Sequence, residues 1–325
     1  MYAGKKVIVV IPCYNVERHI REVISSMPDY VDEIIAVDDA ATDGTWEELK
    51  RTTDARLTVL RHRRNRGLGG AMKTGMKKAL EKDADIMVKV DGDGQMDASR
   101  MTSLLDPIKE GRCDYAKGNR LYSAADRRGM PLPRLFGNLG FSFLTKAATG
   151  YWRLMDPQNG YIAVSRNILS RINLRRIAKN YFFENSMLIE ASINNARIAE
   201  VQMPSIYGDE VSGIKVEKIV FQFPWQLLKG FARRIVIKNI LRDLSPFVIF
   251  LFLGLALMIP GGAFGLYLWL KAVLTQSTVP APTGTIMLSL VPLICGYILV
   301  VQAITIDIIL SPDILHLNSE KKEDL

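Results

Sequence analysis

Two long apolar segments near the C-terminus constrain this 325-residue chain more than any other feature of its sequence. They comprise residues 246–270 and 286–310, and Asp307 is the one charged residue in either of them. An α-helix rises about 1.5 Å per residue, so about 20 apolar residues cross a hydrocarbon core about 30 Å thick. We therefore expect two transmembrane helices within residues 246–310. Pro260 and two following glycines interrupt the first segment, which predicts a kink or a re-entrant turn.

The distribution of basic residues around the two segments predicts their orientation. The linker 271–285 carries one charge, Lys271. Basic residues flank the pair on its other side, namely Lys229, Arg233, Arg234, Lys238 and Arg242 before it and Lys321 and Lys322 after it. Because cytoplasmic flanks carry the excess of Lys and Arg, we expect both ends of the pair to be cytoplasmic. The prediction is a multi-pass protein of the cell membrane, with its main domain and a tail (residues 311–325) in the cytoplasm.

Residues 216–245 combine two stripes at helical spacing. The apolar stripe is Leu227, Phe231 and Ile235, and the cationic stripe is Arg234, Lys238 and Arg242. Such a helix suits the surface of an anionic membrane. The alternative is a docking helix packed on the globular domain.

Residues 1–215 alternate short apolar runs with segments of helical periodicity. The runs 6–12, 32–39, 57–62 and 85–91 are bounded by turn-forming residues. This alternation predicts an α/β domain with a mixed, mostly parallel, Rossmann-like sheet and helices on both faces. In such sheets ligands bind beyond the carboxyl ends of the strands.

Acidic residues stand at two of these predicted strand ends. Asp38 and Asp39 follow one strand, and Asp91 and Asp93 follow another, with Gln95 two residues later. Turn chemistry alone would favour Asp and Gly there, but the position at the ligand-binding edge favours a functional role. Mg²⁺ takes one or two carboxylates and leaves other positions to phosphate and water, so we expect Asp93 as a direct ligand and Asp91 and Gln95 around it. Asp38 and Asp39 could accept hydrogen bonds from a base or a ribose.

The formal net charge of +8 favours an anionic partner. Nucleic acid, anionic lipid and a phosphorylated substrate all fit this charge. The basic run 61–67 precedes a Gly-rich helix start, where N–H groups favour anions, so diphosphate or lipid headgroup contact is favoured there over nucleic acid. A merely solvated face is the alternative. No aromatic residues interleave with it, which argues against nucleic acid. The three cysteines match no metal or disulfide spacing, which indicates a reducing compartment.

Four ordered motifs carry a family resemblance. They are VVIPCYNVE (9–17), VDDAATDGT (37–45), NRGLGGAMKTG (65–75) and VDGDGQMD (90–97). Over residues 5–215 the chain resembles the inverting glycosyltransferases of family 2, which have a GT-A fold. Later elements resemble the polyprenyl-phosphate sugar transferases of that family, such as the dolichyl-phosphate mannose synthases; they are KGNR (117–120), DPQNGYIAV (156–164), YFFEN (181–185), Ser212 and Lys215.

The resemblance implies roles for individual residues. The base and ribose site would be lined by Pro12, Tyr14, Glu17, Asp38 and Asp39. The Mg²⁺ or Mn²⁺ ion and the sugar nucleotide would be held by Asp91, Asp93 and Gln95. Arg120 and Arg134 would bind the phosphate of a lipid acceptor. Asp156 would lie beside the sugar or metal, and Lys215 would close over the bound phosphates. The chain departs from the family pattern where Val16 shifts Glu17 by one position, and where an arginine expected before Ser212 is absent.

The resemblance implies transfer of a sugar, with inversion, from a UDP- or GDP-linked donor to a polyprenyl phosphate such as dolichyl or undecaprenyl phosphate. A phosphate oxygen is already anionic, so Glu184 would then orient rather than deprotonate. If the acceptor is a hydroxyl of a lipid-linked glycan or lipopolysaccharide, Glu184 becomes the candidate base. A carboxylate that merely favours a helix start is the third interpretation of Glu184. A processive synthase is disfavoured, because 221–230 lacks a Gln-x-x-Arg-Trp element. A non-catalytic scaffold is the alternative from another class, and a homo-oligomer is left open.

Overall fold

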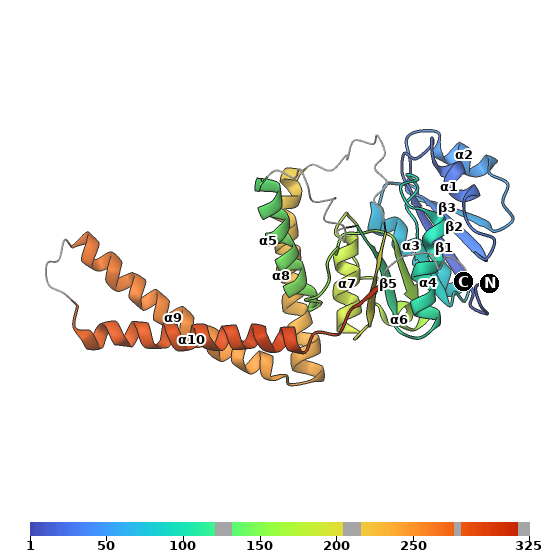
Figure 1. Ribbon diagram of the computed structural model, residues 1–325. Helices are drawn as coiled ribbons and strands as arrows, with labels where there is room; N and C mark the ends of the chain where they lie inside the picture. The colour runs from blue at the N-terminus through green and yellow to red at the C-terminus, as the bar shows by residue number, and fades with distance from the viewer. Residues whose placement is uncertain (121–131, 204–215, 276–280, 318–325) are drawn as a thin grey trace. The chain divides into compact units, whose positions relative to one another are not determined.

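Figure 1 shows the computed structural model, which describes residues 1–120, 132–203, 216–275 and 281–317. The chain divides into two compact units. Unit 1 comprises Met1–Phe231 and Pro312–Leu325, and unit 2 comprises Ala232–Ser311.

Unit 1 contains an eight-stranded sheet in the order β3-β2-β1-β4-β6-β5-β7-β8. Strand β6 runs antiparallel to β4 and β5, and the other neighbouring pairs are parallel. The strands are β1 (Val7–Cys13), β2 (Glu33–Asp38), β3 (Leu57–Arg61), β4 (Ile86–Lys89), β5 (Tyr115–Asn119), β6 (Ile162–Ser165), β7 (Ile198–Gln202) and β8 (Leu315–Leu317). The mixed, mostly parallel sheet predicted from the sequence is confirmed.

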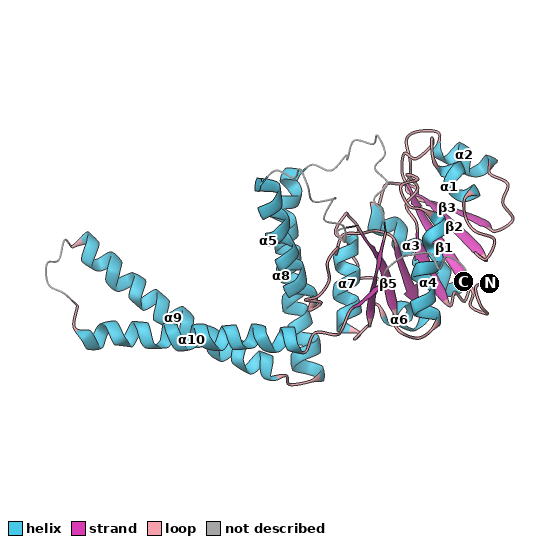
Figure 2. Cartoon of the chain, viewed as in Figure 1, coloured by secondary structure: helices cyan, strands magenta, loops and turns pink. Residues whose placement is uncertain are grey.

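Helices cover both faces of this sheet (Figure 2). The helices on the sheet are α1 (Ile20–Ser25), α2 (Thr45–Arg51), α3 (Leu68–Glu81), α4 (Met101–Lys109), α6 (Arg166–Arg171) and α7 (Phe183–Ile193). Helices α5 (Leu132–Thr149) and α8 (Val216–Arg234) lie side by side next to α7 (Figure 2), with the ring centroids of Phe141 and Phe223 5.6 Å apart. Successive residues of a strand point to opposite faces, so β1 contributes Val9 to one core and Val10 to the other. Leu104 of α4 packs in the first core, and Met76 of α3 and Met187 of α7 pack in the second.

The C-terminal segment differs from the prediction. Residues 311–325 were expected to form a cytoplasmic tail, but Leu315–Leu317 form β8 and pair with β7 at the end of the sheet. Ile314 is buried in the core beside this strand. The reason is that three apolar residues can bury their side chains and satisfy their backbone at a free sheet edge.

Unit 2 contains two long helices, α9 (Pro246–Leu274) and α10 (Thr283–Ile309), each long and apolar enough to cross a membrane. Helix α9 runs without interruption through Pro260, so a re-entrant turn there is excluded. Small residues recur at every seventh position where the two helices meet. They are Gly254 and Gly261 of α9 and Ser289, Gly296 and Ala303 of α10.

These small residues allow the two backbones to approach closely. A Cβ atom added at Gly254 would lie 2.9 Å from the carbonyl oxygen of Gly296, and one added at Gly261 would lie 2.9 Å from the amide nitrogen of Leu293. In a membrane, such packing takes the place of the hydrophobic effect between helices. The large apolar side chains face outward instead; among them are Phe252, Leu266, Trp269, Leu288 and Ile298.

Arg234 does not belong to an exposed cationic stripe, contrary to the sequence-based prediction. Its guanidinium is 2% exposed and binds the carboxylate of Asp307 in two places, with Nη1–Oδ1 2.8 Å and Nη2–Oδ2 2.9 Å. Asp307, the one charge in the apolar segments, thereby joins α10 to the end of α8. The chain continues from α8 as a π-helical segment, Ile235–Arg242, on which Arg242 is exposed.

Candidate active site

The predicted acidic residues meet at one edge of the sheet. Strands β2, β1 and β4 are adjacent and parallel, so their carboxyl ends lie side by side. Asp38 ends β2 and Asp39 follows it, while Asp91 and Asp93 come two and four residues after Lys89, which ends β4. The topology therefore brings together two motifs that are about fifty residues apart in the chain.

The loop after β4 presents oxygen ligands. The side chains of Asp91, Asp93 and Gln95 are all partly exposed. Asp93 Oδ1 accepts a hydrogen bond from the Gln95 amide at 3.0 Å, and Gly94 has a φ of +76°, which turns the chain back at this point. Carboxylate and amide oxygens are hard donors that fit Mg²⁺ or Mn²⁺. Among the described residues, no three His, Cys, Asp or Glu side chains form a complete metal cage. Such a loop would need donor phosphates and water to complete a coordination sphere.

A buried lysine that the sequence analysis missed joins three parts of the site. Lys89, the last residue of β4, is fully buried, and its Nζ lies 2.6 Å from Asp91 Oδ1 and 3.4 Å from Glu184 Oε1. The same nitrogen donates to the carbonyl of Gly160 at 3.2 Å. Burial by itself lowers the pKa of Lys89, but Asp91 and Glu184 raise it above its usual value. The sequence did contain a signal for this residue. A lysine within a strand that is buried on both faces needs a partner for its charge.

Glu184 lies in the first turn of α7, an element whose residues are all buried. The residue is 9% exposed, and burial raises the pKa of its carboxyl, with Asp91 adding to the rise and Lys89 opposing it. Its position confirms a carboxylate at a helix start. The carboxylate faces Lys89 in the interior, which is a poor place from which to deprotonate an incoming hydroxyl.

A second cluster surrounds Asp156. Arg120 donates to Asp156 Oδ2 through Nε at 3.0 Å and through its backbone N–H at 3.1 Å. The carboxylate is buried, which alone would raise its pKa, but Lys117 and Arg120 lower the pKa below its usual value. The Asp156 amide donates in turn to Glu200 Oε1 at 2.9 Å. Asp156 thus orients Arg120, and its predicted place beside the sugar or metal stays a prediction.

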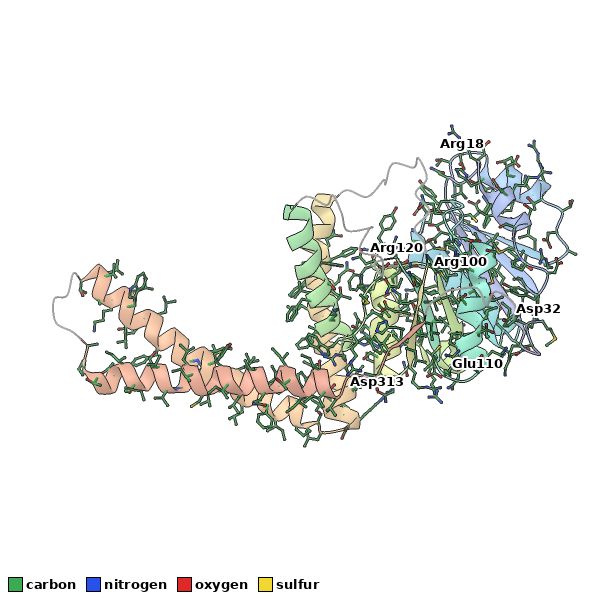
Figure 3. All side chains as sticks on the ribbon, in the orientation of Figure 1. Arg18, Asp32, Arg100, Glu110, Arg120 and Asp313 are labelled. Carbon is green, nitrogen blue, oxygen red and sulfur yellow. The ribbon has the colours of Figure 1, made fainter. Side chains whose placement is uncertain are left out.

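Arg120 itself remains accessible. Its side chain is 47% exposed and is labelled in Figure 3. Of its predicted companions, Arg134 lies on α5 with its side chain outside the described residues, and Lys215 lies outside them altogether. Their contacts with an acceptor stay predictions.

The two carboxylates at the end of β2, Asp38 and Asp39, have partners within the protein. Asp39, 2% exposed, accepts from the Gly67 amide at 2.7 Å and the Arg66 amide at 2.9 Å, and contacts His62 Nδ1 at 2.6 Å. Asp38 is fully buried and accepts from the Ala41 amide at 2.9 Å. Asp39 therefore holds the loop that leads into α3, and the predicted contacts of Asp38 and Asp39 with a base or ribose stay predictions.

The remaining predicted donor contacts are distributed around β1. Pro12 is buried in the strand, whereas Tyr14 is 46% exposed beyond it. Glu17 Oε2 accepts from the Gly44 amide at 2.9 Å, so Glu17 braces the turn before α2. Whether these side chains line a nucleotide site stays a prediction.

The start of α3 is not an open anion site. The amide of Gly69 donates to the carbonyl of Lys179 at 2.9 Å, and a Cβ added at Gly69 would lie 1.9 Å from the carbonyl oxygen of Ala178. The glycines thus permit close packing against the loop before α7. The expectation that these amides attract an anion is therefore wrong for Gly69.

Comparisons with known proteins agree with this architecture. The model of the glycosyl transferase family 2 matches residues 8–172. The chain is 33% identical over 220 residues to a UDP-N-acetylglucosamine–dolichyl-phosphate N-acetylglucosaminyltransferase of Methanococcus voltae, covering 63% of this chain and 87% of that protein. It is 29% identical to an undecaprenyl-phosphate mannosyltransferase of Micrococcus luteus, covering 60% of this chain and 82% of the relative.

A solved structure shows the same fold. The glucosyl-3-phosphoglycerate synthase of Mycobacterium tuberculosis, in complex with Mn²⁺ and UDP-glucose, superposes with a TM-score of 0.56 at 23% identity. The superposition covers 71% of this chain and 80% of that protein. With the sheet topology, the family match and the M. voltae relative in agreement, the chain belongs to glycosyltransferase family 2.

Proposed function

We propose that this protein transfers a sugar, with inversion at the anomeric carbon, from a nucleoside diphosphate sugar to a polyprenyl phosphate. The observation that carries the proposal is the half-exposed Arg120 guanidinium, which the buried carboxylate of Asp156 holds in place. A guanidinium so oriented suits the oxygens of a phosphate. The M. voltae and M. luteus relatives, whose names specify polyprenyl phosphate acceptors, support the same acceptor class here.

The donor would bind at the carboxyl edge of β1, β2 and β4. Asp93 would be the main protein ligand of a divalent cation, with Asp91 and Gln95 beside it, and the cation would neutralise charge on the leaving diphosphate. Lys89 holds the Asp91 carboxylate in place at the start of this loop through its 2.6 Å contact. UDP-N-acetylglucosamine is the first donor to test, because the relative that uses it is 33% identical.

The buried position of Glu184 favours a phosphate acceptor over a sugar hydroxyl. A hydroxyl acceptor needs a base within hydrogen-bond reach of its proton. Glu184 instead faces Lys89 and is 9% exposed. A phosphate oxygen carries its negative charge already, so the residues around it need only position it and compensate its charge.

The path of the chain supports a membrane hairpin with unit 1 on one side. The chain leaves unit 1 after Phe231 and returns to it at Pro312. If α9 and α10 each cross the bilayer once, the segments before Phe231 and after Pro312 lie on the same side, as their common unit requires. Together with the basic flanks, this supports the cytoplasmic placement of unit 1.

The test is a direct assay of transfer. Membranes containing the protein would be incubated with radiolabelled UDP-N-acetylglucosamine, UDP-glucose or GDP-mannose, together with polyprenyl phosphate. Polyprenol of the same length is the matched control, because it differs only in offering a hydroxyl. We expect one donor to label the lipid phosphate and none to label polyprenol. Labelling of polyprenol, or of a lipid-linked glycan alone, would refute the acceptor assignment.

A further inference from the structure

The segment that follows the membrane hairpin is part of the catalytic sheet. Residues 312–317, here called the returning segment, include β8, which pairs in parallel with β7. Ile314 is 6% exposed within one core, and Leu315 and Leu317 pack against the other. The segment is therefore docked by side chains on both faces of the sheet as well as by its backbone.

Two side chains of the returning segment contact residues that flank the Asp156 loop. Asp313, labelled in Figure 3, forms an exposed ion pair with Arg153. His316 stands opposite Glu200 in the β7–β8 register, and His316 Nδ1 lies 3.4 Å from Glu200 Oε2. The segment thus reaches both the start of the loop and the carboxylate that holds it.

Glu200 connects this segment to the proposed acceptor site. It is 1% exposed, and its carboxylate accepts from the Met155 amide at 3.0 Å and from the Asp156 amide at 2.9 Å. Asp156 in turn holds Arg120 at 3.0 Å. A buried carboxylate bound by two backbone amides fixes the loop firmly, because leaving either amide unpaired would cost free energy.

We propose that the returning segment is a positioning element: by pairing with β7 and contacting Glu200, it holds the Met155–Asp156 loop and so sets the orientation of Arg120. The part that concerns the acceptor rests on the proposed function. The consequence is that residues 312–317, beyond the second apolar helix, are required for acceptor recognition. Losing their contacts should have little effect on the donor site, because β1, β2 and β4 lie in the other half of the sheet.

The kinetic test uses three variants of the full chain. Glu200→Gln keeps the side-chain volume but removes the charge that two amides share, and His316→Ala removes the contact from β8. We expect Glu200→Gln to raise the acceptor KM roughly tenfold, as weakening charge-assisted hydrogen bonds does. His316→Ala should raise it by a smaller factor, and the donor KM should stay within about twofold in both. Arg166→Ala is the matched control, since its ion pair with Asp83 is exposed on both sides, lies outside the returning segment and should contribute little.

The structural test is independent of activity. Ile314→Asp places a charge in the core and should release β8 from β7. Hydrogen–deuterium exchange, measured without substrates, should then accelerate in residues 153–157 while β1 and β4 stay protected. If the wild-type protein transfers no sugar to polyprenyl phosphate, the proposed function fails and the exchange measurement alone decides the positioning role. Three results would each overturn the inference. The first is an unchanged acceptor KM in Glu200→Gln and His316→Ala, and the second is an equal rise in the donor and acceptor KM. The third is a rate of exchange in residues 153–157 that stays the same when β8 is released.

Discussion

The ion pair between Arg234 and Asp307 is the interaction in unit 2 whose loss we expect to be most costly. Both side chains are buried, and two hydrogen bonds of 2.8 and 2.9 Å join them. Replacing Arg234 with Met removes the guanidinium but leaves the Asp307 carboxylate in place. Removing one partner of a buried pair typically costs about 3–5 kcal/mol, a large share of an ordinary folding free energy of about 5–15 kcal/mol.

The neighbouring Lys238 is the reason to expect a cost near the lower end of that range. Burial and the neighbouring Arg234 lower the pKa of Lys238, whereas Asp307 raises it. When Arg234 is absent, Lys238 loses a repulsive neighbour and can compensate part of the Asp307 charge. We therefore expect Arg234→Met to cost about 3 kcal/mol, near the bottom of the measured range.

The assay is thermal unfolding of the detergent-solubilised protein, followed by the fraction that remains monodisperse in size-exclusion chromatography. At about 2–4 °C per kcal/mol, the single variant should lose on the order of 10 °C in Tm. Combining Arg234→Met with Asp307→Leu removes both charges and should restore most of the loss, because hydrophobic replacement of a whole pair is often neutral. A single variant that melts with the wild type, or a double variant that melts as low as the single, would refute this reasoning.

Four further predictions concern the site and the membrane. Asp93→Asn should abolish transfer and weaken Mn²⁺-dependent donor binding in calorimetry, and full activity in EDTA would contradict the metal assignment. Lys89→Met should cost about 3–5 kcal/mol by leaving two carboxylates without their cation, and adding Glu184→Gln should recover part of the lost Tm. Arg120→Ala should raise the acceptor KM roughly tenfold to a hundredfold while Glu184→Gln stays mild, and a dead Glu184→Gln enzyme beside a normal Arg120→Ala enzyme would indicate a hydroxyl acceptor. Ser277→Cys, in the linker between the apolar helices, should react with an impermeant thiol reagent from outside the cell, and labelling only from the cytoplasmic side would contradict the hairpin.

The sequence by itself determined the first four strands, β1 to β4, and the two long apolar helices. Apolar runs of four to seven residues became buried strands, and the two long apolar segments became α9 and α10. Those patterns are local. A strand or helix that is buried on one face has apolar residues at a regular spacing, and one that is buried all round has an apolar run of a characteristic length, so both can be recognised along the chain. The same holds for Asp91 and Asp93, which had to follow β4 once the run before them was a strand.

Tertiary structure alone decided which charges are partners. Lys89 meets Glu184 across 95 positions of sequence, and Arg234 meets Asp307 across 73, because distant elements pack together there. The motifs of Asp39 and Asp156 suggested ligand contacts but did not indicate their partners within the protein, which are the loop before α3 and Arg120. The return of β8 to the sheet was equally hidden. Three residues carry too little pattern to indicate a strand, and the free edge of β7 that stabilises them exists only after the fold has formed.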